Sequence, residues 1–228
     1  MTAGSEDSLS GSALIRKKTS SAVVDYVLEE LFAGRLRSGD RVDLDEVGRA
    51  LDVSRIPVRE ALLILERDGI VSTRYHRGVY IEPFDAASIL DDFEIIGLLS
   101  GVAVRRLAEK QDPEPIAMLR KLVDELKVAN PEDRGEVFRL VQEILTLEHR
   151  AGGSRRLRAE LRAYTGFLPA ALRIQTRRSH QAIVRAHARV VTAIAAGAGE
   201  KAAQYRLEDF RGAGRDIVRE LERRGVLT

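Results

Sequence analysis

Val53 to Gly69 reads V-S-R-I-P-V-R-E-A-L-L-I-L-E-R-D-G, and this order of residues predicts one amphipathic helix. Its apolar residues recur at the i, i+3, i+4 and i+7 positions of a single helix face, at Val58, Ala61, Leu62 and Leu65. Ser54 stands at the N-cap, where a hydroxyl accepts a hydrogen bond from a free backbone N–H of the first turn. Gly69 follows the last turn, where a left-handed residue commonly ends a helix.

Arg55 and Arg59 lie one helical turn apart near the start of this helix. An arginine in that position can pair with the O6 and N7 atoms of guanine in a major groove, or it can hold a phosphate. The helix N-terminus adds free N–H groups and a partial positive charge. The alternative is an ordinary surface helix with two solvated arginines.

A β-hairpin is predicted directly after the helix. Residues 70–71 and 79–81 are the expected strands, and the basic segment from Arg74 to Gly78 forms the tip, with glycine at the turn. Upstream, a helix is expected over residues 19–33, and Asp43 is expected to cap a short second helix. Three helices followed by a basic hairpin indicate a winged helix-turn-helix, which favours DNA binding.

Composition narrows the class of protein. The 228 residues include 44% hydrophobic residues and no cysteine, so the core is adequate, and disulfides, zinc–thiolate sites and cysteine nucleophiles are excluded. The sequence contains neither a signal peptide nor a membrane-length apolar run, and we expect a cytoplasmic protein that does not enter a membrane. Residues 1–84 carry slightly more acidic than basic side chains, so overall charge does not favour DNA binding. Binding to DNA would depend on arginines gathered on one surface of this part.

The chain is predicted to be mostly α-helical and to have two domains. Residues 1–15 are rich in serine and glycine and are expected to form a disordered tail. Residues 16–84 are expected to form the winged helix-turn-helix, and residues 85–228 an all-α antiparallel helical bundle. Helices of the bundle are expected at about 86–110, 114–128, 132–150, 154–176, 179–196 and 200–224.

From Gly39 to Pro83 the sequence resembles the DNA-binding domain of GntR-family bacterial transcription regulators. The shared motif is V-S-R-x-P-V-R-E-A-L, here Val53 to Leu62, followed by an L-E-x-D-G run and a wing that ends in R-G-V. The resemblance implies contacts to operator DNA by Ser54, Arg55, Arg59 and Gly78, with His76 and Arg77 as wing-tip candidates. Asp45 falls where the fatty-acid regulator of this family uses an arginine against DNA, so that contact does not carry over.

The segment H-x-x-V-V-x-A-I-A-A-G, from His187 to Gly197, resembles the FCD effector domain of the FadR branch of the same family. Many FCD domains hold a divalent metal through an Asp-x-x-x-His pair and one histidine on each of two later helices. In this chain the pair falls on Val141 and Leu145, and the later positions fall on His187 and Asp209. We expect no required metal. One alternative is zinc, nickel or manganese at His187 and Asp209, with Glu143 or His149 as a further ligand in a shifted register, and another is a hydrogen-bonded pocket role for His187.

An apolar cavity with a few polar anchors would suit a small-molecule effector. His180 and His187 are seven residues apart and share a helix face, and Arg139 and Gln142 lie on the helix of the missing metal ligands. These four residues are the predicted effector-binding side chains, and an organic or acyl acid is the predicted ligand. A plain packed core is the alternative.

The combined prediction is a homodimeric DNA-binding regulator and not an enzyme. It is expected to act as a repressor on a pseudo-palindromic operator of double-stranded DNA and to respond to a small molecule. The competing classes are an all-helical small-molecule enzyme and a scaffold protein whose helix-turn-helix does not bind DNA. The sequence offers no nucleophile–base pair or glycine-rich phosphate loop for an enzyme, and the arginine pair with the basic wing favours DNA over a scaffold role.

Overall fold

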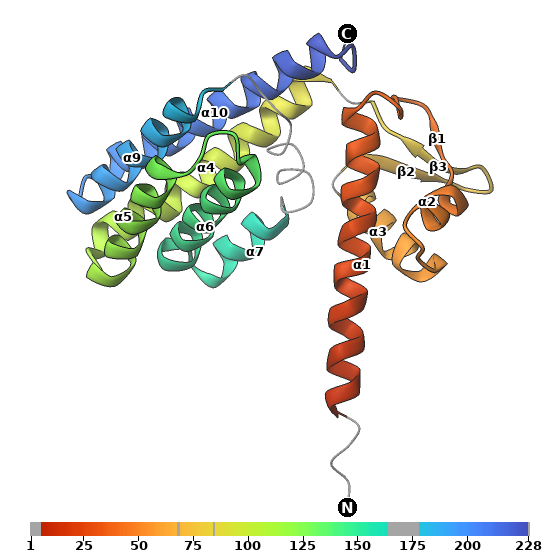
Figure 1. Cartoon of the computed structure of the whole chain (residues 1–228), viewed down its shortest axis with the longest axis horizontal. Helices are drawn as coiled ribbons and strands as arrows, with labels where there is room; N and C mark the ends of the chain where they lie inside the picture. The colour runs from red at the N-terminus through yellow and green to blue at the C-terminus, as the bar shows by residue number, and fades with distance from the viewer. Residues whose placement is uncertain (1–5, 68, 84, 164–177, 228) are drawn as a thin grey trace, which may run out of the picture. The chain divides into compact units, whose positions relative to one another are not determined.

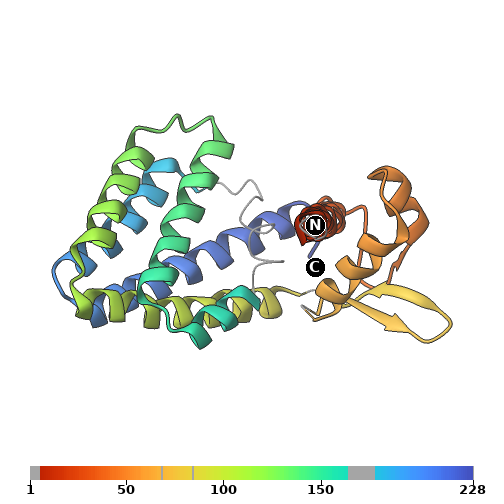
Figure 2. The same cartoon turned by 90° about the horizontal axis from the view of Figure 1, so that it is seen from below.

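The computed structural model describes residues 6–67, 69–83, 85–163 and 178–227. Contacts divide the chain into two compact units. The first runs to Asp85 and takes in the residues from Leu221 onward, and the second spans Ala86–Glu220. Figure 1 and Figure 2 show both units in perpendicular views. None of the helices in the described ranges combines the length and the apolar content needed to span a membrane.

The first unit combines helices with a small sheet (Figure 1). Its helices are α1 (Glu6–Phe32), α2 (Leu44–Ala50) and α3 (Arg55–Arg67), and its strands are β1 (Arg41–Val42), β2 (Val71–Arg74) and β3 (Gly78–Ile81). The strands are antiparallel in the order β1-β3-β2, with Ser72 opposite Tyr80. Helix α1 packs against α3, and the predicted apolar face of α3 is buried. This arrangement is the predicted winged helix-turn-helix.

Two boundaries differ from the sequence prediction. Helix α1 begins at Glu6, so residues 6–15 are helical and do not form the expected disordered tail. Once the packed part of a helix has formed, each further residue adds a backbone hydrogen bond at little cost, so the helix extends beyond its buried portion. Residues from Leu221 onward group with the first unit, where Val226 lies close to Gly34, and not with the bundle as expected.

The second unit is an all-α bundle. Its helices are α4 (Ala86–Lys110), α5 (Pro113–Val128), α6 (Arg134–Gly152), α7 (Arg155–Ala163), α9 (His180–Ala195) and α10 (Gly199–Arg223). The side chains of Asp112, Asp133 and Ser179 accept hydrogen bonds from the first turns of α5, α6 and α9, which fixes where these helices begin. Helices α4 and α5 each pack against α6 and α9. The helix expected over residues 154–176 is α7 in its first part, and the rest of that prediction lies outside the described residues.

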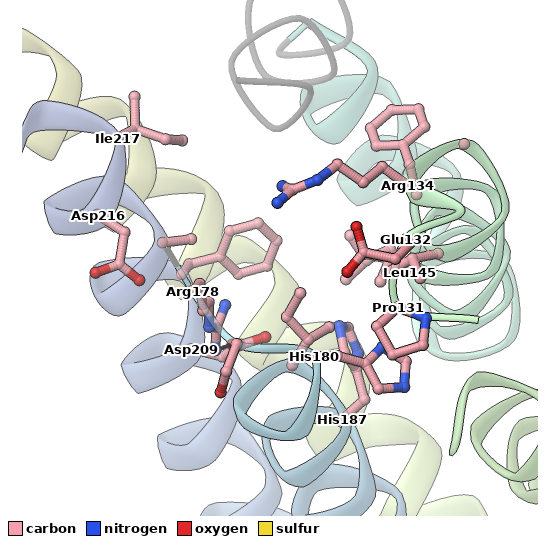
Figure 3. Close-up of a pocket in the computed structure, with 18 residues that line it drawn as sticks. Pro131, Glu132, Arg134, Leu145, Arg178, His180, His187, Asp209, Asp216 and Ile217 are labelled. Atoms are coloured by element: carbon pink, nitrogen blue, oxygen red, sulfur yellow. Dashed lines mark hydrogen bonds and ion pairs between the residues drawn. The ribbon is translucent and has the colours of Figure 1, made fainter. Parts of the chain in front are cut away.

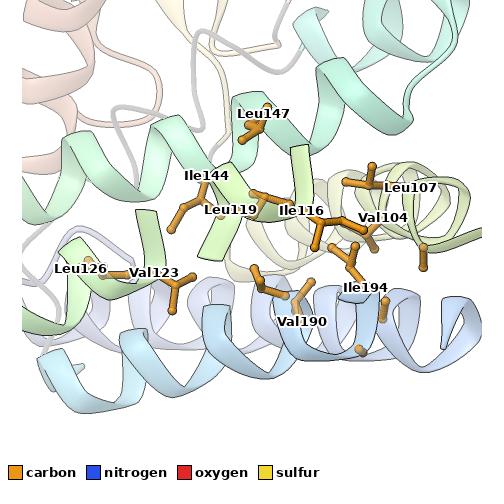
Figure 4. Close-up of a cluster of buried hydrophobic side chains, with 14 of the residues drawn as sticks. Val104, Leu107, Ile116, Leu119, Val123, Leu126, Ile144, Leu147, Val190 and Ile194 are labelled. Carbon is orange, nitrogen blue, oxygen red and sulfur yellow. The ribbon is translucent and has the colours of Figure 1, made fainter. Parts of the chain in front are cut away.

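A cluster of buried apolar side chains joins α4, α5, α6 and α9 (Figure 4). Leu107, Leu119, Ile144 and Val190 each contribute a fully buried side chain to it. Burial of an aliphatic side chain of this size stabilises the folded state by about 1.5–3 kcal/mol. The cluster therefore fixes the relative positions of α6 and α9, which carry the second candidate site.

The C-terminal end of α6 lies directly on α4. A Cβ atom at Gly152 would lie 1.9 Å from the carbonyl oxygen of Ala103, so no side chain fits there. Near this contact, Oγ of Ser100 on α4 and Nε2 of His149 on α6 are 2.9 Å apart and share a hydrogen bond. Glycine at the end of α6 therefore permits the close approach that brings polar groups of α6 into the bundle interior.

Candidate functional site

The N-terminal end of α3 presents polar side chains to solvent. Ser54, Arg55 and Arg59 are exposed, whereas Val58, Ala61, Leu62 and Leu65 on the opposite face are buried. This division holds the helix by one face and leaves its first turn, with free backbone N–H groups, open to a partner. The three residues predicted to contact DNA from this helix are therefore accessible together.

Arg55 reaches Asp45 across the turn between α2 and α3. Its Nη2 atom lies 3.1 Å from Oδ1 of Asp45, and the two side chains are 79% and 66% exposed. An ion pair this exposed contributes about 0–1 kcal/mol and is readily exchanged for another anion. The pair therefore leaves Arg55 at the surface.

Strands β2 and β3 form a hairpin with a basic tip. His76 adopts φ = 56°, and its ring meets the ring of Tyr75 edge-on, with centroids 4.0 Å apart. The guanidinium of Arg74 lies over the Tyr80 ring, 4.3 Å from the centroid, which holds this arginine along the hairpin. His76 and Arg77 are both exposed, so the two wing-tip candidates are accessible.

Gly78, at the start of β3, borders a polar hollow between the hairpin and α3. The hollow has a volume of about 590 Å³, and its charged lining residues are Arg41, Asp43, Asp45, Arg55 and Arg59. A Cβ atom at Gly78, where φ is +101°, would lie 2.9 Å from Nε of Arg41, so glycine leaves room for this arginine. No sequence pattern points to Arg41, because its place depends on the pairing of the short strand β1 with β3.

Asp43 caps α2 as predicted. Its Oδ1 atom accepts hydrogen bonds of 3.0 Å from the backbone N–H groups of Glu46 and Asp45, and these bonds lower the pKa of its carboxyl. The charge of Asp43 is thus partly satisfied by the start of α2. Three guanidinium groups face two carboxylates around the hollow, which leaves an excess of positive charge.

The second unit contains a pocket of about 580 Å³ between α6, α9 and α10 (Figure 3). Its apolar lining residues include Val137, Phe138, Val141, Leu145, Ile183, Phe210, Ala213 and Ile217. Its charged and histidine lining residues are Glu132, Arg134, Arg178, His180, His187, Asp209 and Asp216. A volume of this order and a mainly apolar wall with a few polar groups are typical of small-molecule sites.

Two of the four predicted effector residues line this pocket. His180 and His187 contribute to it from α9, whereas Arg139 and Gln142 are not among its lining residues. Arg139 instead forms ion pairs with Glu136 and Glu143 on an exposed face of α6. Position 139 points about 100° away from the pocket-lining position 138, whereas Gln142 follows Phe138 by about one turn and is still not among the lining residues.

A buried arginine lies next to the pocket. Arg206 of α10 is 0% exposed, and its Nη2 donates to Oε1 of Glu148 at 2.6 Å, while its Nη1 donates to Oδ2 of Asp209 at 2.9 Å. The same Nη1 lies 3.4 Å from Nδ1 of His187. Asp209 also accepts a hydrogen bond from Arg178, which lines the pocket beside it (Figure 3). One guanidinium therefore joins α6, α9 and α10.

Burial governs the protonation of these groups. Burial, reinforced by the positive charge of Arg206, lowers the pKa of His187 to about 3 and the pKa of His149 to about 4. Burial raises the pKa of Glu148, although Arg206 opposes this effect. Burial alone would also raise the pKa of Asp209, but the positive charges of Arg206 and Arg178 lower it. At neutral pH, His187 is therefore an uncharged imidazole and Asp209 is a carboxylate.

The residues at the expected metal positions do not fit a metal ion. Val141 and Leu145 line the pocket with hydrocarbon side chains, and His187 and Asp209 both contact the guanidinium of Arg206. Across the described residues, no group of three histidine, aspartate or glutamate side chains is arranged to hold a metal ion. A metal cation at His187 and Asp209 would be repelled by the neighbouring guanidinium. The alternative of a metal at these two residues is thus not supported, and the hydrogen-bonded pocket role of His187 fits.

Comparisons with known proteins match both parts of the chain. Residues 19–81 match the family described as "Bacterial regulatory proteins, gntR family", and residues 91–210 match the FCD domain. An uncharacterised HTH-type transcriptional regulator of Mycobacterium tuberculosis (strain ATCC 25618 / H37Rv) is 41% identical over 152 residues, which is 67% of this chain and 62% of that protein. An uncharacterised HTH-type transcriptional regulator of Bacillus subtilis (strain 168) is 26% identical over 79% of this chain and 82% of that protein. The chain spans less than two thirds of the mycobacterial relative.

Solved structures share the fold. The Escherichia coli McbR/YncC structure has a TM-score of 0.62 and 18% identity, and the match covers 88% of this chain and 97% of that one. A putative transcriptional regulator GntR from Rhodococcus sp. RHA1 has a TM-score of 0.57 and 23% identity, over 87% and 97% of the two chains. At these identities the likeness shows the fold alone. The gntR family and the relatives named here are regulators of transcription, which speaks against the enzyme alternative.

Proposed function

Because this chain belongs to the gntR family of bacterial regulatory proteins and carries an FCD domain, we propose that it is a cytoplasmic, homodimeric repressor that binds a DNA operator and responds to an organic acid. The observation that carries this proposal is the exposed pair Arg55 and Arg59 at the open N-terminal end of α3. The basic wing stands on the same unit and supplies a second set of accessible cations.

The proposed DNA contacts are of two kinds, those to base edges and those to the sugar–phosphate backbone. The first turn of α3 enters a major groove, where Arg55 and Arg59 read guanine edges or hold phosphates, and Ser54 contacts the backbone. His76, Arg77 and Gly78 bring the wing tip against the neighbouring strand. We add Arg41 to the interface, because it lines the same hollow as Arg55 and Arg59 and its guanidinium lies against Gly78.

Dimerisation gives the operator its symmetry. A two-fold dimer carries two copies of α3 and fits a pseudo-palindromic site with half-sites about one helical turn apart. Helix α4 supports this proposal, because its apolar residues Ile95 and Leu98 are 40% and 51% exposed and lie one helical turn apart, so they form one apolar surface. Neighbouring apolar side chains in solvent commonly mark a protein–protein contact.

The pocket of the second unit suits an amphipathic acid. Its apolar wall can take a hydrocarbon body, and the guanidinium of Arg178 offers a partner for a carboxylate. Within the described residues, neither ring nitrogen of His180 has a hydrogen-bond partner, although both nitrogens are buried at this pocket. A buried polar group without a hydrogen-bond partner destabilises the protein, so a ligand that forms a hydrogen bond with His180 would bind more tightly.

Effector binding changes DNA affinity by the difference in its binding free energy between two arrangements of the dimer. Couplings of this kind are typically about 1–3 kcal/mol, which corresponds to roughly 5- to 150-fold in DNA affinity. Repression then follows if the effector-free protein is the arrangement that fits the operator.

A ligand screen tests the effector part of the proposal. Thermal unfolding is measured with monocarboxylic acids of increasing chain length and with the corresponding amides, which lack the charge. At least one acid should raise Tm while its amide does not, because a ligand that binds the native state stabilises it. Arg178→Met should abolish the shift, whereas Arg139→Met, outside the pocket, should retain it. If no acid raises Tm, the organic-acid effector is wrong.

A further inference from the structure

Arg206 lies where three helices of the second unit meet. Its guanidinium contacts Glu148 from α6, His187 from α9, and Asp209 from its own helix α10. We propose that Arg206 is a permanent internal cation that holds these three helices together, so that the second unit folds and functions without a divalent metal. This inference rests on the contacts of Arg206 and does not require that any effector be known.

Arg206 connects several helices, as a bridging metal ion does in a helical bundle. Its partners lie 58, 19 and 3 residues away along the chain, so a single cation connects distant segments. Metal ions in helical bundles connect facing helices in the same way, by drawing donor side chains from each of them inward. Here the acceptor groups converge on the two Nη atoms of one donating side chain, and they are spread over the width of a guanidinium.

Charge balance explains why no further cation is needed. Arg206 and Arg178 carry two positive charges, and they face the two carboxyl groups of Glu148 and Asp209. Arg206 and Glu148 are both 0% exposed, so any added charge would be poorly solvated. A divalent ion would therefore add positive charge beside two guanidinium groups in the protein interior, where the cost of desolvation is high.

The forked guanidinium of Arg206 reaches one oxygen of each of two carboxylates, while Oε2 of Glu148 and Nε of Arg206 have no hydrogen-bond partner among the described residues. One Nη of Arg206 serves Glu148 at 2.6 Å, and the other serves Asp209 at 2.9 Å. A lysine ammonium is a point charge on a flexible stem and lacks the fixed fork that holds two partners in a set direction. The arginine is therefore required for its geometry as well as for its charge.

The internal cation also orders the wall of the pocket. Asp209 accepts a hydrogen bond from Arg206 through Oδ2 and one from Arg178 through Oδ1. Arg178 and His187 both line the pocket, and both contact this network. Arg206 is therefore a positioning residue, which acts on the pocket through Asp209 and His187.

The first test measures metal directly. Untagged wild-type protein is analysed for zinc, nickel and manganese before and after treatment with EDTA and reloading, and Tm is measured in each state. We expect metal well below one ion per chain and no change of Tm with EDTA. A stoichiometric metal whose removal lowers Tm, and which is lost in His187→Ala, would overturn the proposal.

The second test removes the cation while keeping most of its bulk. Arg206→Met leaves Glu148 buried without its partner and Asp209 with Arg178 alone, and it should lower Tm by roughly 10 °C. Arg206→Lys should fall between this variant and the wild type. The matched control is Arg211→Met on the same helix, since Arg211 pairs with Glu94 at the surface and its loss should lower Tm by about 2 °C or less. Equal effects of the two methionine variants would contradict the proposal.

The third test separates charge pairing from packing. Glu148→Gln removes the charge that faces Arg206, so the double variant Glu148→Gln with Arg206→Met should lose less Tm than the sum of the single losses. Simple addition of the two losses would mean that Arg206 acts by filling space, and the proposal would fail. If Arg206→Met is not recovered folded, the wild-type metal analysis and the comparison of Arg206→Lys with Arg211→Lys decide in its place.

Discussion

The guanidinium of Arg55 lies 3.1 Å from the carboxylate of Asp45, and both groups are exposed beside the hollow that Arg59 also lines. Arg55 belongs to the first turn of α3, and Asp45 to the first turn of α2. The pair places an acidic group among the arginines that we propose to meet DNA. We infer that Asp45 competes with phosphate for Arg55 and moderates DNA affinity.

Asp45→Asn should therefore tighten DNA binding. The change frees Arg55 and removes a charge that repels phosphate, so we expect an affinity roughly 3- to 10-fold higher at low salt and a smaller gain at high salt. Fluorescence anisotropy with a labelled operator measures both. Asp91→Asn, an exposed aspartate on α4, is the control and should leave affinity unchanged. Weaker binding by Asp45→Asn would show that the carboxylate positions Arg55 for DNA instead of competing for it.

Arg41 should act as a phosphate contact. Arg41→Ala is expected to weaken binding by roughly 3- to 10-fold for operator and unrelated DNA alike, and to reduce the slope of log affinity against log salt by about one. Titrations at several salt concentrations give both quantities. Arg37→Ala, in the preceding turn, is the matched control because Arg37 does not line the hollow. A loss confined to the operator would make Arg41 a base-reading residue, and no loss would remove it from the interface.

Dimerisation should depend on the exposed residues of α4. Leu98→Glu places a charge in the proposed contact, so sedimentation velocity should show a shift from dimer to monomer and weaker operator binding. Val128→Glu is the control, because Val128 is 85% exposed at the end of α5 and lies outside the proposed contact. A Leu98→Glu variant that sediments as a dimer at micromolar concentration would place the interface elsewhere.

Acid should destabilise the second unit through its buried histidines. The pKa of His149 is lowered to about 4 and that of His187 to about 3, so each unfolded imidazole binds a proton below about pH 6.5 while the folded one does not. The free energy of unfolding is therefore unaffected by these histidines above about pH 6.5. As pH drops toward 4, it falls by about 1.4 kcal/mol per histidine and pH unit. The raised pKa of Glu148 acts in the opposite direction, because a buried carboxyl favours the protonated folded state at lower pH.

Urea unfolding at pH 7.0 and 5.5 measures the balance of these effects. We expect a net loss of about 1–3 kcal/mol for the wild type. His149→Gln should lose less between the two pH values, because one of the depressed histidines is gone. The exposed wing residue His76 provides the control, and His76→Gln should behave as the wild type does. Stability that rises on acidification would mean that the effect of Glu148 dominates.

The sequence pattern was sufficient for most of the fold because the relevant signals are local. The buried stripe of α3 at Val58, Ala61, Leu62 and Leu65 follows from helical periodicity alone, and the cap at Asp43 follows from side-chain chemistry. Strand β1 gave no such signal, because it has two residues and exists through its pairing with β3. For the same reason, no local pattern in the sequence indicates Arg41 as part of the interface.

The buried ion network could be predicted only in part. Glu148 lies four residues after Ile144, and Arg206 lies four residues before Phe210, so both charged residues fall within otherwise apolar helix faces. A charged residue at such a position signals a buried partner, since an unpaired buried charge is costly. Which charges pair is decided by the packing of α6 against α10, and the sequence of one chain does not reveal it. The same limit applies to Arg139 and Gln142, which are each one position away from a pocket-lining residue but do not line the pocket.

The central claim is that the N-terminal end of α3 binds DNA through its exposed arginines. The most direct test selects a duplex from a random pool with the wild-type protein and then compares its dissociation constant for the wild type and for Arg59→Ala over a range of salt concentrations. We predict that a pseudo-palindromic duplex is selected and that Arg59→Ala binds it roughly 10- to 100-fold more weakly while remaining folded. If no duplex is selected, or if the folded variant keeps the wild-type affinity and salt slope, the claim is contradicted.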